Sequence, residues 1–246
     1  MIVLLCLSAV FPVLMRTEVV KSDCFLATDC SDVYSSGKSS SGVYTIFSID
    51  GPVQVYCDMV PRGESQSKGH WTVILRRMDG EVNFFRPWDS YKRGFGNKEG
   101  EYWLGLEFIH LLTRRNRYKL RVDLEDFDGT KAYAVYESFS VDSEADGYKL
   151  HVSGFIDGGA GDSFSYQNGM KFSTFDKDQD LRKDGSCALK YSMGGFWYNN
   201  CDHTNPTGLY LWGKEDGASV ISTNWYYWKK NWKSLKAITM KITHVM

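Results

Sequence analysis

Residues 176–202 constrain this chain more than any other stretch, because they combine closely spaced carboxylates with two cysteines. The residues concerned are Asp176, Asp178, Asp180, Cys187 and Cys201. Carboxylates at alternate positions repel one another unless a cation lies among them, and Ca²⁺ prefers hard oxygen ligands. A small ring closed by the two cysteines would hold such a loop in shape. The stretch therefore predicts a calcium-stiffened recognition loop.

The beginning of the chain predicts secretion. An apolar run from Ile2 to Met15 is too short to span a bilayer and suits the apolar region of a signal peptide. Pro12 and the abrupt change to polar residues at Arg16 oppose the alternative, a buried N-terminal helix. We therefore expect a signal peptide over roughly residues 1–20, cleaved before about Ser22.

Secretion changes the meaning of the cysteines, because disulfides persist in an oxidising compartment. With Cys6 in the signal peptide, an odd number remains, so one cysteine bonds to another chain or stays a free thiol. Sequence proximity favours the pairs Cys187–Cys201 and Cys30–Cys57. Cys24, in an N-terminal arm of residues 21–29, is left over. We expect it to form an interchain disulfide, and a buried or capped thiol is the alternative.

Alternating apolar and polar residues predict a β scaffold in the first two thirds of the chain. Leu120, Val122 and Leu124 share one face of a strand expected over residues 118–124. The other expected strands cover residues 53–57, 70–78, 131–139, 148–155 and 238–242, and one short helix is expected over residues 105–112. After Phe155 this pattern gives way to Gly, Asp and aromatic residues. Loops that long in a compact domain are usually functional.

Composition and spacing argue against several functions. The net charge of -1 is unlike that of a nucleic-acid binder, and no His or Cys pair has the spacing of a zinc site. Ser163, in a Gly-Asp-Ser-Phe sequence, is the candidate nucleophile of a hydrolase. A Ser nucleophile needs a positioned His and a carboxylate, and the histidines are scattered along the chain. We therefore expect a binding protein rather than an enzyme.

The aspartate run does not have the pattern of an EF-hand. Counted from Asp176, the position that requires Gly is Leu181, and the position that requires Glu is Cys187. A calcium loop of another kind, built from two carboxylates and backbone carbonyls, fits the spacing. The alternative is a solvated turn of mixed charge, indicated by Lys177, Arg182 and Lys183.

Aromatic and polar residues near the second pair of cysteines are of the kinds that line small-molecule or sugar pockets. They are Tyr191, Trp197, Tyr198, Asn200, Cys201, Asp202, His203, Trp225 and Trp228. The alternative for most of these rings is burial in the core.

Short motifs spread over residues 30–245 share one family resemblance. They are Cys30-Ser-Asp-Val-Tyr34, Gly42-Val-Tyr44, Val55-Tyr-Cys-Asp-Met59, Trp71-Thr-Val-Ile-Leu-Arg-Arg77, Glu101-Tyr-Trp-Leu-Gly-Leu106, Phe172-Ser-Thr-Phe-Asp176, Phe196-Trp-Tyr198 and Met240-Lys-Ile242. The set resembles the fibrinogen C-terminal (fibrinogen-related) domain. The resemblance implies an α+β fold over residues 30–245, with a central antiparallel sheet and a loop-rich calcium- and ligand-binding subdomain.

The resemblance also implies roles for particular residues. Members of the family hold Ca²⁺ through the second and third acids of such a run and two downstream carbonyls. Here these are Asp178 and Asp180, with the carbonyls of Arg182 and Asp184. Asp176 would support them from behind. Compared with the usual spacing in the family, this chain has one extra residue between the aspartate run and Cys187. The resemblance also implies the disulfides Cys30–Cys57 and Cys187–Cys201, the pairs that sequence proximity favours.

Lectin-like members of the family bind acetylated sugars in a pocket beside the metal. The corresponding residues here are Tyr191, Cys201, Asp202, His203 and Trp225. Asp202 stands where most lectin-like members have His, which changes the hydrogen bonding and charge of the pocket.

Together the features of the sequence and the resemblance predict a secreted, calcium-dependent binding protein. The resemblance implies a place in the extracellular matrix with microfibrils or elastic fibres, and elastin, fibrillin or collagen, and also acetylated or microbial glycans, as partners. We expect a disulfide-linked homo-oligomer, because repetition of a weak site raises avidity. The alternatives are a soluble innate-immune lectin and, from another class, a hydrolase that uses Ser163.

Overall fold

The computed structural model describes residues 26–59, 69–190, 192–214 and 221–245. The predicted signal peptide, Cys24 and Tyr191 lie outside the described residues. Within the described ranges, no helix is long and apolar enough to cross a membrane.

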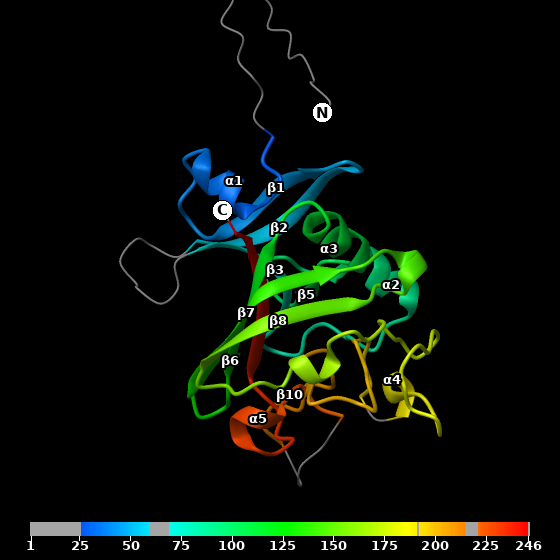
Figure 1. Ribbon diagram of the computed structural model, residues 1–246. Helices are drawn as coiled ribbons and strands as arrows, with labels where there is room; N and C mark the ends of the chain where they lie inside the picture. The colour runs from blue at the N-terminus through cyan, green and yellow to red at the C-terminus, as the bar shows by residue number, and fades with distance from the viewer. Residues whose placement is uncertain (1–25, 60–68, 191, 215–220, 246) are drawn as a thin grey trace, which may run out of the picture.

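A large antiparallel sheet forms the centre of the molecule (Figure 1). In spatial order its main strands are β1 (Gly42–Ser48), β2 (Gly51–Met59), β3 (His70–Arg77), β11 (Ala237–His244), β6 (Tyr118–Glu125), β7 (Lys131–Val141) and β8 (Leu150–Gly158). Two short strands, β4 (Phe95–Gly96) and β5 (Tyr102–Trp103), pair beside β3. The C-terminal strand β11, red in Figure 1, lies between β3 and β6. The sheet therefore places the last strand of the chain beside the first three strands.

Each predicted strand is present, and the predicted helix is α3 (Leu106–Thr113). In β6 the alternating residues Leu120, Val122 and Leu124 are buried, because they form one face of the strand. Several elements of the structure were not predicted, among them β1 and the short helix α1 (Cys30–Ser35).

Helix α3 packs against the sheet and against α2 (Trp88–Arg93). Its residues Ile109 and Leu112 are buried. At its last residue, the Thr113 hydroxyl donates to the Ile109 carbonyl at 2.9 Å and accepts the Val141 N–H at 3.2 Å. One polar side chain therefore ends the helix and fastens it to β7.

Between β8 and β11, the described residues form only short elements. They are η2 (Ser165–Gln167), α4 (Cys187–Lys190), β9 (Thr204–Asn205), β10 (Asn224–Trp225) and α5 (Tyr226–Lys229); a further short turn, η1 (Glu144–Asp146), precedes β8. The fully buried Trp197 supports these loops. Its ring lies 5.2 Å from the ring of Phe172, and its indole N–H donates to the Tyr148 carbonyl at 2.7 Å. Aromatic packing thus replaces regular structure here.

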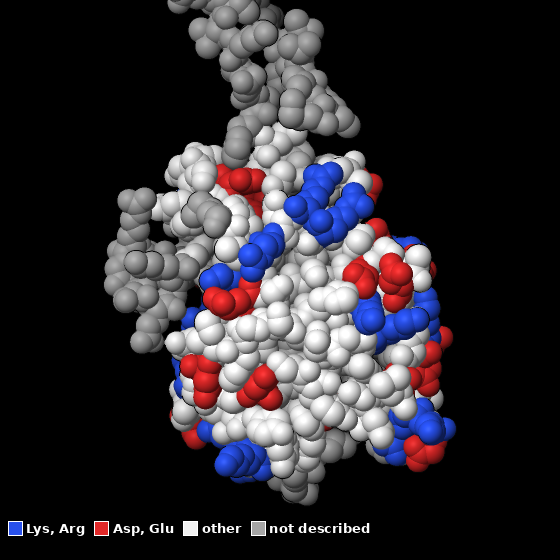
Figure 2. Space-filling view, viewed as in Figure 1, with Lys and Arg blue, Asp and Glu red and all other residues white. Residues whose placement is uncertain are grey.

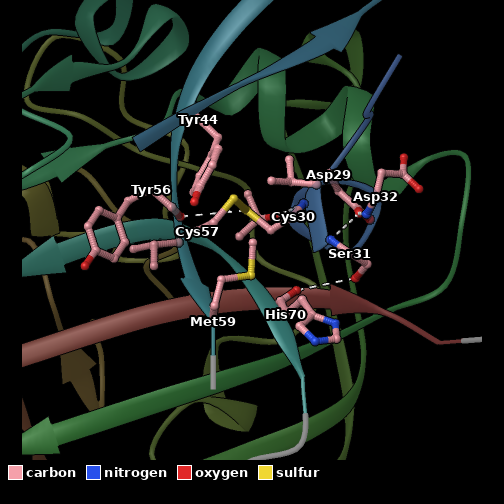
Figure 3. Close-up of a disulfide and its surroundings, with 12 residues drawn as sticks. Asp29, Cys30, Ser31, Asp32, Tyr44, Tyr56, Cys57, Met59 and His70 are labelled. Carbon is pink, nitrogen blue, oxygen red and sulfur yellow. Dashed lines mark hydrogen bonds between the residues drawn. A yellow bond between two sulfur atoms is a disulfide. The ribbon is translucent and has the colours of Figure 1, made fainter. Parts of the chain in front are cut away.

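The Cys30–Cys57 disulfide fastens α1 to β2 (Figure 3). The N-cap residue Asp29 accepts backbone N–H groups of α1 through Oδ1. Its other oxygen accepts the Tyr118 hydroxyl at 2.9 Å and lies 2.8 Å from His244 Nδ1. Helix α1 is therefore tied to β2 covalently and to β6 and β11 through one carboxylate.

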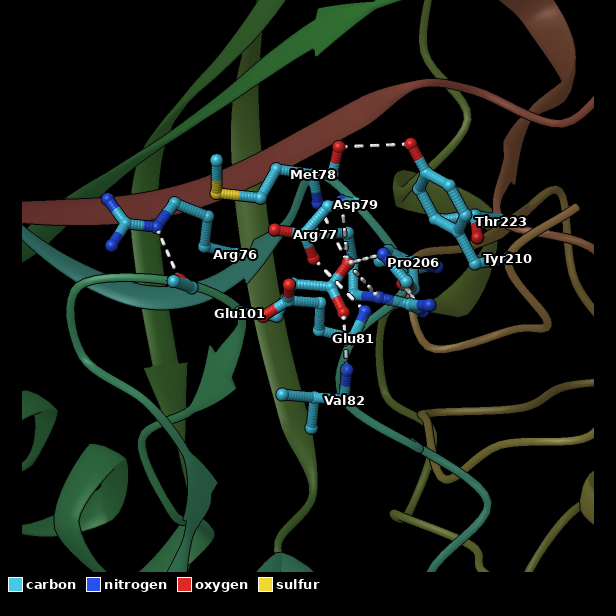
Figure 4. A network of polar contacts seen from close by, with 12 residues as sticks. Arg76, Arg77, Met78, Asp79, Glu81, Val82, Glu101, Pro206, Tyr210 and Thr223 are labelled. Atoms are coloured by element: carbon cyan, nitrogen blue, oxygen red, sulfur yellow. Dashed lines mark hydrogen bonds and ion pairs between the residues drawn. The ribbon is translucent and has the colours of Figure 1, made fainter. Parts of the chain in front are cut away.

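A buried ion pair connects the sheet to the loop-rich part (Figure 4). Arg77, at the end of β3, places Nε 3.3 Å from Glu101 Oε1. Its Nη1 donates to the carbonyls of Pro206 and Gly208 at 3.0 and 2.8 Å. Because these carbonyls belong to the loop after β9, the pair positions that loop against the sheet.

Candidate functional site

Asp176, the first carboxylate of the run, joins the loop to helix α2. Its Oδ1 accepts the Trp88 N–H at 2.9 Å and the Thr174 hydroxyl at 2.7 Å. The next residue, Lys177, places its ammonium 3.8 Å from the centroid of the Trp88 ring. Asp176 therefore joins the start of the loop to α2, and its Oδ1 already accepts an N–H at a helix N-terminus.

The carboxylates of Asp178 and Asp180 lie together farther along the loop. Asp178 Oδ1 accepts the Asp180 N–H at 3.2 Å. Asp180 accepts the Arg182 N–H at 2.8 Å through Oδ1 and the Cys187 N–H at 2.7 Å through Oδ2. Burial, with a smaller contribution from the charge of Asp178, raises the pKa of Asp180 even though these N–H groups lower it. The pair thus has unbalanced negative charge that a cation would relieve.

The donor chemistry of this loop fits calcium. Two carboxylates and nearby backbone carbonyls are hard oxygen ligands on an irregular segment. In the parts of the chain that the structure describes, no three His, Cys, Asp or Glu side chains form a metal-binding group. A calcium site here would therefore need carbonyl or water oxygens as well. Arg182 Nε lies 3.0 Å from Asp184 Oδ1, so the Asp184 carboxylate is paired with Arg182.

The second disulfide connects this loop to the wall of a pocket. Cys187 begins α4, and its sulfur is bonded to that of Cys201. The Leu181 N–H donates to the Asn199 carbonyl at 3.1 Å, and a cis peptide bond precedes Cys201. Residues 181–186, directly before Cys187, have no regular structure. The carboxylate loop and the segment around Cys201 are thus held together covalently and by a backbone hydrogen bond.

A pocket of about 290 Å³ opens beside this disulfide. Its lining residues are Tyr166, Arg182, Ser192, Asn200, Cys201, Asp202, His203 and Trp232. Three of the predicted pocket residues, Cys201, Asp202 and His203, therefore lie together. Tyr166 and Trp232 were not predicted, because they come from distant segments; the only signal was their aromatic character in a loop-rich region.

The pocket has a polar side and an aromatic side. The Ser192 hydroxyl donates to Asp202 Oδ2 at 2.7 Å, and burial raises the pKa of Asp202 to about 7. Burial also lowers the pKa of His203, whose ring stacks on Tyr166 with centroids 4.0 Å apart. Near neutral pH, His203 is therefore uncharged and Asp202 is partly protonated. The pocket therefore offers a polar ligand two side chains of little charge together with the Arg182 guanidinium.

Two sequence-based assignments differ from the structure. Trp225 was expected in the pocket, but it is 1% exposed and its indole N–H donates to the carbonyls of Ala160 and Gly161, both at 3.1 Å. That prediction is wrong, because the ring belongs to the core. Ser163, the candidate nucleophile, is fully buried and its hydroxyl oxygen accepts the Tyr227 N–H at 2.9 Å. It supports the first turn of α5 instead of facing solvent.

Known proteins resemble this chain in family, in sequence and in fold. A family model described as fibrinogen beta and gamma chains, C-terminal globular domain, matches residues 26–245. Microfibril-associated glycoprotein 4 from Homo sapiens is 50% identical over 221 residues, covering 87% of this chain and 84% of that protein. The Bos taurus protein of the same name is 47% identical over 236 residues, covering 93% and 89%.

Two solved structures have the same fold. The fibrinogen-like globe domain of human ANGPTL2 aligns with a TM-score of 0.81 and 40% identity, over 89% of this chain and 99% of that one. A lamprey fibrin D-dimer, complexed with the peptide ligand Gly-His-Arg-Pro-amide, aligns with a TM-score of 0.80 and 34% identity, over 95% and 78%. The resemblance and the fold class expected from the motifs are confirmed.

Proposed function

The chain belongs to the fibrinogen family of C-terminal globular domains, and from that premise we propose that it binds extracellular-matrix ligands in a calcium-dependent manner. Its relationship to microfibril-associated glycoprotein 4 identifies it as a secreted matrix protein and not an enzyme. Calcium would be held by the carboxylates of Asp178 and Asp180 and the carbonyls of Arg182 and Asp184. It would supply the positive charge that the loop lacks.

One observation carries the proposal: Asp180 is connected to two walls of the pocket. It accepts the N–H of Cys187, whose sulfur is bonded to Cys201. It also accepts the backbone N–H of Arg182, and Arg182 lines the same pocket. A cation at Asp180 would fix the position of both segments. This supports coupling between calcium and ligand binding, since a ligand site gains affinity when its walls are preorganised.

The character of the pocket favours an acetylated sugar as ligand. Asp202 and His203 carry little charge near neutral pH, and Tyr166 and His203 form a stacked aromatic wall in the pocket that Arg182 also lines. In its protonated form Asp202 can donate a hydrogen bond as well as accept one. It could therefore supply the donor that most lectin-like family members provide with His.

The relatives named microfibril-associated glycoprotein 4 support elastic-fibre or microfibril partners. We include elastin, fibrillin and collagen in the proposal on that ground. An interchain disulfide through Cys24 would present several copies of the pocket at once, and a weak site repeated in an oligomer gains avidity. The second candidate function, a soluble innate-immune lectin for microbial glycans, is favoured by the same aromatic wall.

Binding to immobilised ligands tests this function. The surfaces are tropoelastin, N-acetylglucosamine conjugated to albumin, and unacetylated glucosamine conjugated to albumin, each with calcium and with EDTA. We expect EDTA to weaken binding to tropoelastin or the acetylated conjugate by at least about tenfold, the scale of a typical coupling between sites. Asp180→Asn should reproduce that loss in the presence of calcium, since it removes the carboxylate that connects metal and pocket.

The matched control is Asp184→Asn in the same loop. Its carboxylate is paired with Arg182, and the proposed site uses only its carbonyl, which the substitution retains. We expect this variant to bind like the wild type. Binding that is equal in calcium and EDTA would contradict calcium dependence. Binding to the acetylated conjugate alone would favour the innate-immune lectin over the matrix-binding protein. Absence of binding to every surface would contradict both functions.

A further inference from the structure

Three arginines on the loop between α3 and β6 differ from the other arginines of the described chain. Arg114, Arg115 and Arg117 are all exposed and follow one another with only Asn116 between them. Lys and Arg runs of this density occur in patches that bind polyanions. We call Arg114, Arg115 and Arg117 the arginine cluster.

The other described arginines have a partner in the folded protein. Arg77, Arg93, Arg121 and Arg182 form ion pairs with carboxylates, and Arg76 and Arg86 lie over aromatic rings. Among contacts between described residues, no ion pair or cation–ring contact involves the arginine cluster. Three like charges this close together repel one another, so their mutual interaction does not favour gathering them.

The end of helix α3 explains only part of the cluster. Cations in the last turn of a helix are stabilised by its dipole, and Arg114 is the C-cap residue of α3. Arg117 comes after the turn, directly before β6. Its carbonyl accepts the Val245 N–H at 2.8 Å, while the Arg114 N–H donates to the His110 carbonyl at 3.0 Å. The backbone of the loop is therefore fixed at both ends, at Arg114 and at Arg117, while the three arginine side chains are exposed.

The surroundings of the cluster indicate the kind of partner. Basic side chains gather between the β1–β2 hairpin and α3, at the upper right of the face in Figure 2. Arg115 and Asn116 line a shallow apolar depression together with Ile49, which is 55% exposed, and Leu111. The aromatic rings that line the depression are Phe47, which is half-buried, and Phe108, which is buried, so neither is a fully exposed platform for a nucleic-acid base. The chain is secreted, so the polyanions it meets are extracellular.

We propose that the arginine cluster is a binding site for a sulfated polysaccharide, separate from the pocket beside Cys201. A guanidinium offers paired N–H donors that match the oxygens of a sulfate group, and it stays charged at every physiological pH. Binding at this site is independent of calcium, because no carboxylate of the metal loop takes part. A matrix protein with this site would hold a fibre ligand and a sulfated chain at the same time.

The test is fluorescence anisotropy with a labelled heparin dodecasaccharide, over sodium chloride concentrations from about 50 to 200 mM. The variant replaces Arg114, Arg115 and Arg117 by Ala. We expect its affinity at the lowest salt to fall at least about tenfold, and the slope of log affinity against log salt to shrink by about three, one for each lost contact. Addition of EDTA should not change heparin binding by the wild type, and the Asp180→Asn variant should bind heparin as the wild type does. These two results separate this site from the proposed calcium-dependent pocket.

A second triple variant controls for net charge. Lys38, Lys171 and Lys233 are exposed on other parts of the surface, and their replacement by Ala removes the same total charge. We expect this variant to bind heparin like the wild type. Equal binding by the arginine variant and the wild type would overturn the proposal. Equally tight binding of polyglutamate or a single-stranded oligonucleotide of the same charge would overturn its preference for sulfate.

Discussion

Replacing Glu101 by Ala is expected to lower the free energy of unfolding by about 3–5 kcal/mol, the cost of leaving a buried charge without its partner. Glu101 is 1% exposed and Arg77 is 2% exposed. Although burial alone would raise the pKa of Glu101, the Arg77 guanidinium and backbone N–H groups hold it below its ordinary value. Those N–H groups belong to Met78, Gly80 and Val82, so the carboxylate also holds the turn after β3. Urea unfolding with the disulfides intact measures the effect.

Two further variants test whether the unpaired buried charge causes the loss of stability expected for Glu101→Ala. The double variant Arg77→Met, Glu101→Leu removes both charges, and it should be less destabilised than Glu101→Ala because no buried charge remains. Asp89→Ala breaks the exposed Arg93–Asp89 pair and should cost less than about 1 kcal/mol. If Glu101→Ala cost no more than Asp89→Ala, the sheet would not depend on this ion pair.

Replacing Asp202 by Asn is expected to stabilise the protein above neutral pH. Burial raises the pKa of Asp202 from 3.8 to about 7. Between these two values the folded state keeps a proton that the unfolded state releases, so stability is fullest below the unfolded pKa and falls as the pH rises towards 7. The total loss is up to about 4 kcal/mol, at about 1.4 kcal/mol for each unit of pKa shift. Asn keeps the oxygen that accepts the Ser192 hydroxyl and cannot ionise.

The measurement is the free energy of unfolding at a series of pH values from 4 to 8, in EDTA so that calcium does not contribute. The difference between Asp202→Asn and the wild type should be near zero at about pH 4, grow through pH 5 and 6, and level off above about pH 7. Asp50→Asn, in the exposed turn between β1 and β2, is the matched control and should give no such trend. A difference that is constant with pH would mean that Asp202 ionises normally in the folded protein.

The strands of the sheet were predictable because burial of one face leaves an alternating pattern, as in β6. The order of the strands was not, because nothing local to the sequence of β11 indicates that it pairs with both β3 and β6. Strand β1 carries the β-branched and aromatic residues of a typical strand, so its signal was present but not used. Helix α1 is short and is fixed mainly by its N-cap and a disulfide, and neither contributes an amphipathic pattern.

The candidate site was predictable to the extent that its residues lie in one stretch. Cys201, Asp202 and His203 follow one another and lie in one pocket wall. Tyr166 and Trp232 reach the same pocket from far along the chain, so spacing could not place them. Trp225 carried the same aromatic signal as Trp232 but is buried, because sequence alone does not show which side of a loop packs against the core. The calcium ligands and the roles of Cys24 and Tyr191 stay predictions.

We propose that Asp178 and Asp180 form a calcium site that controls the adjoining pocket. Calorimetric titration of calcium into the wild type, Asp178→Asn, Asp180→Asn and the Asp184→Asn control tests it most directly. We predict one calcium ion per chain in the wild type and in the control, with a dissociation constant of about 10⁻⁴–10⁻³ M, as for other extracellular modules. Neither of the other two variants should give measurable heat of binding. Unchanged titration of Asp178→Asn and Asp180→Asn, or no binding by the wild type at millimolar calcium, would contradict the claim.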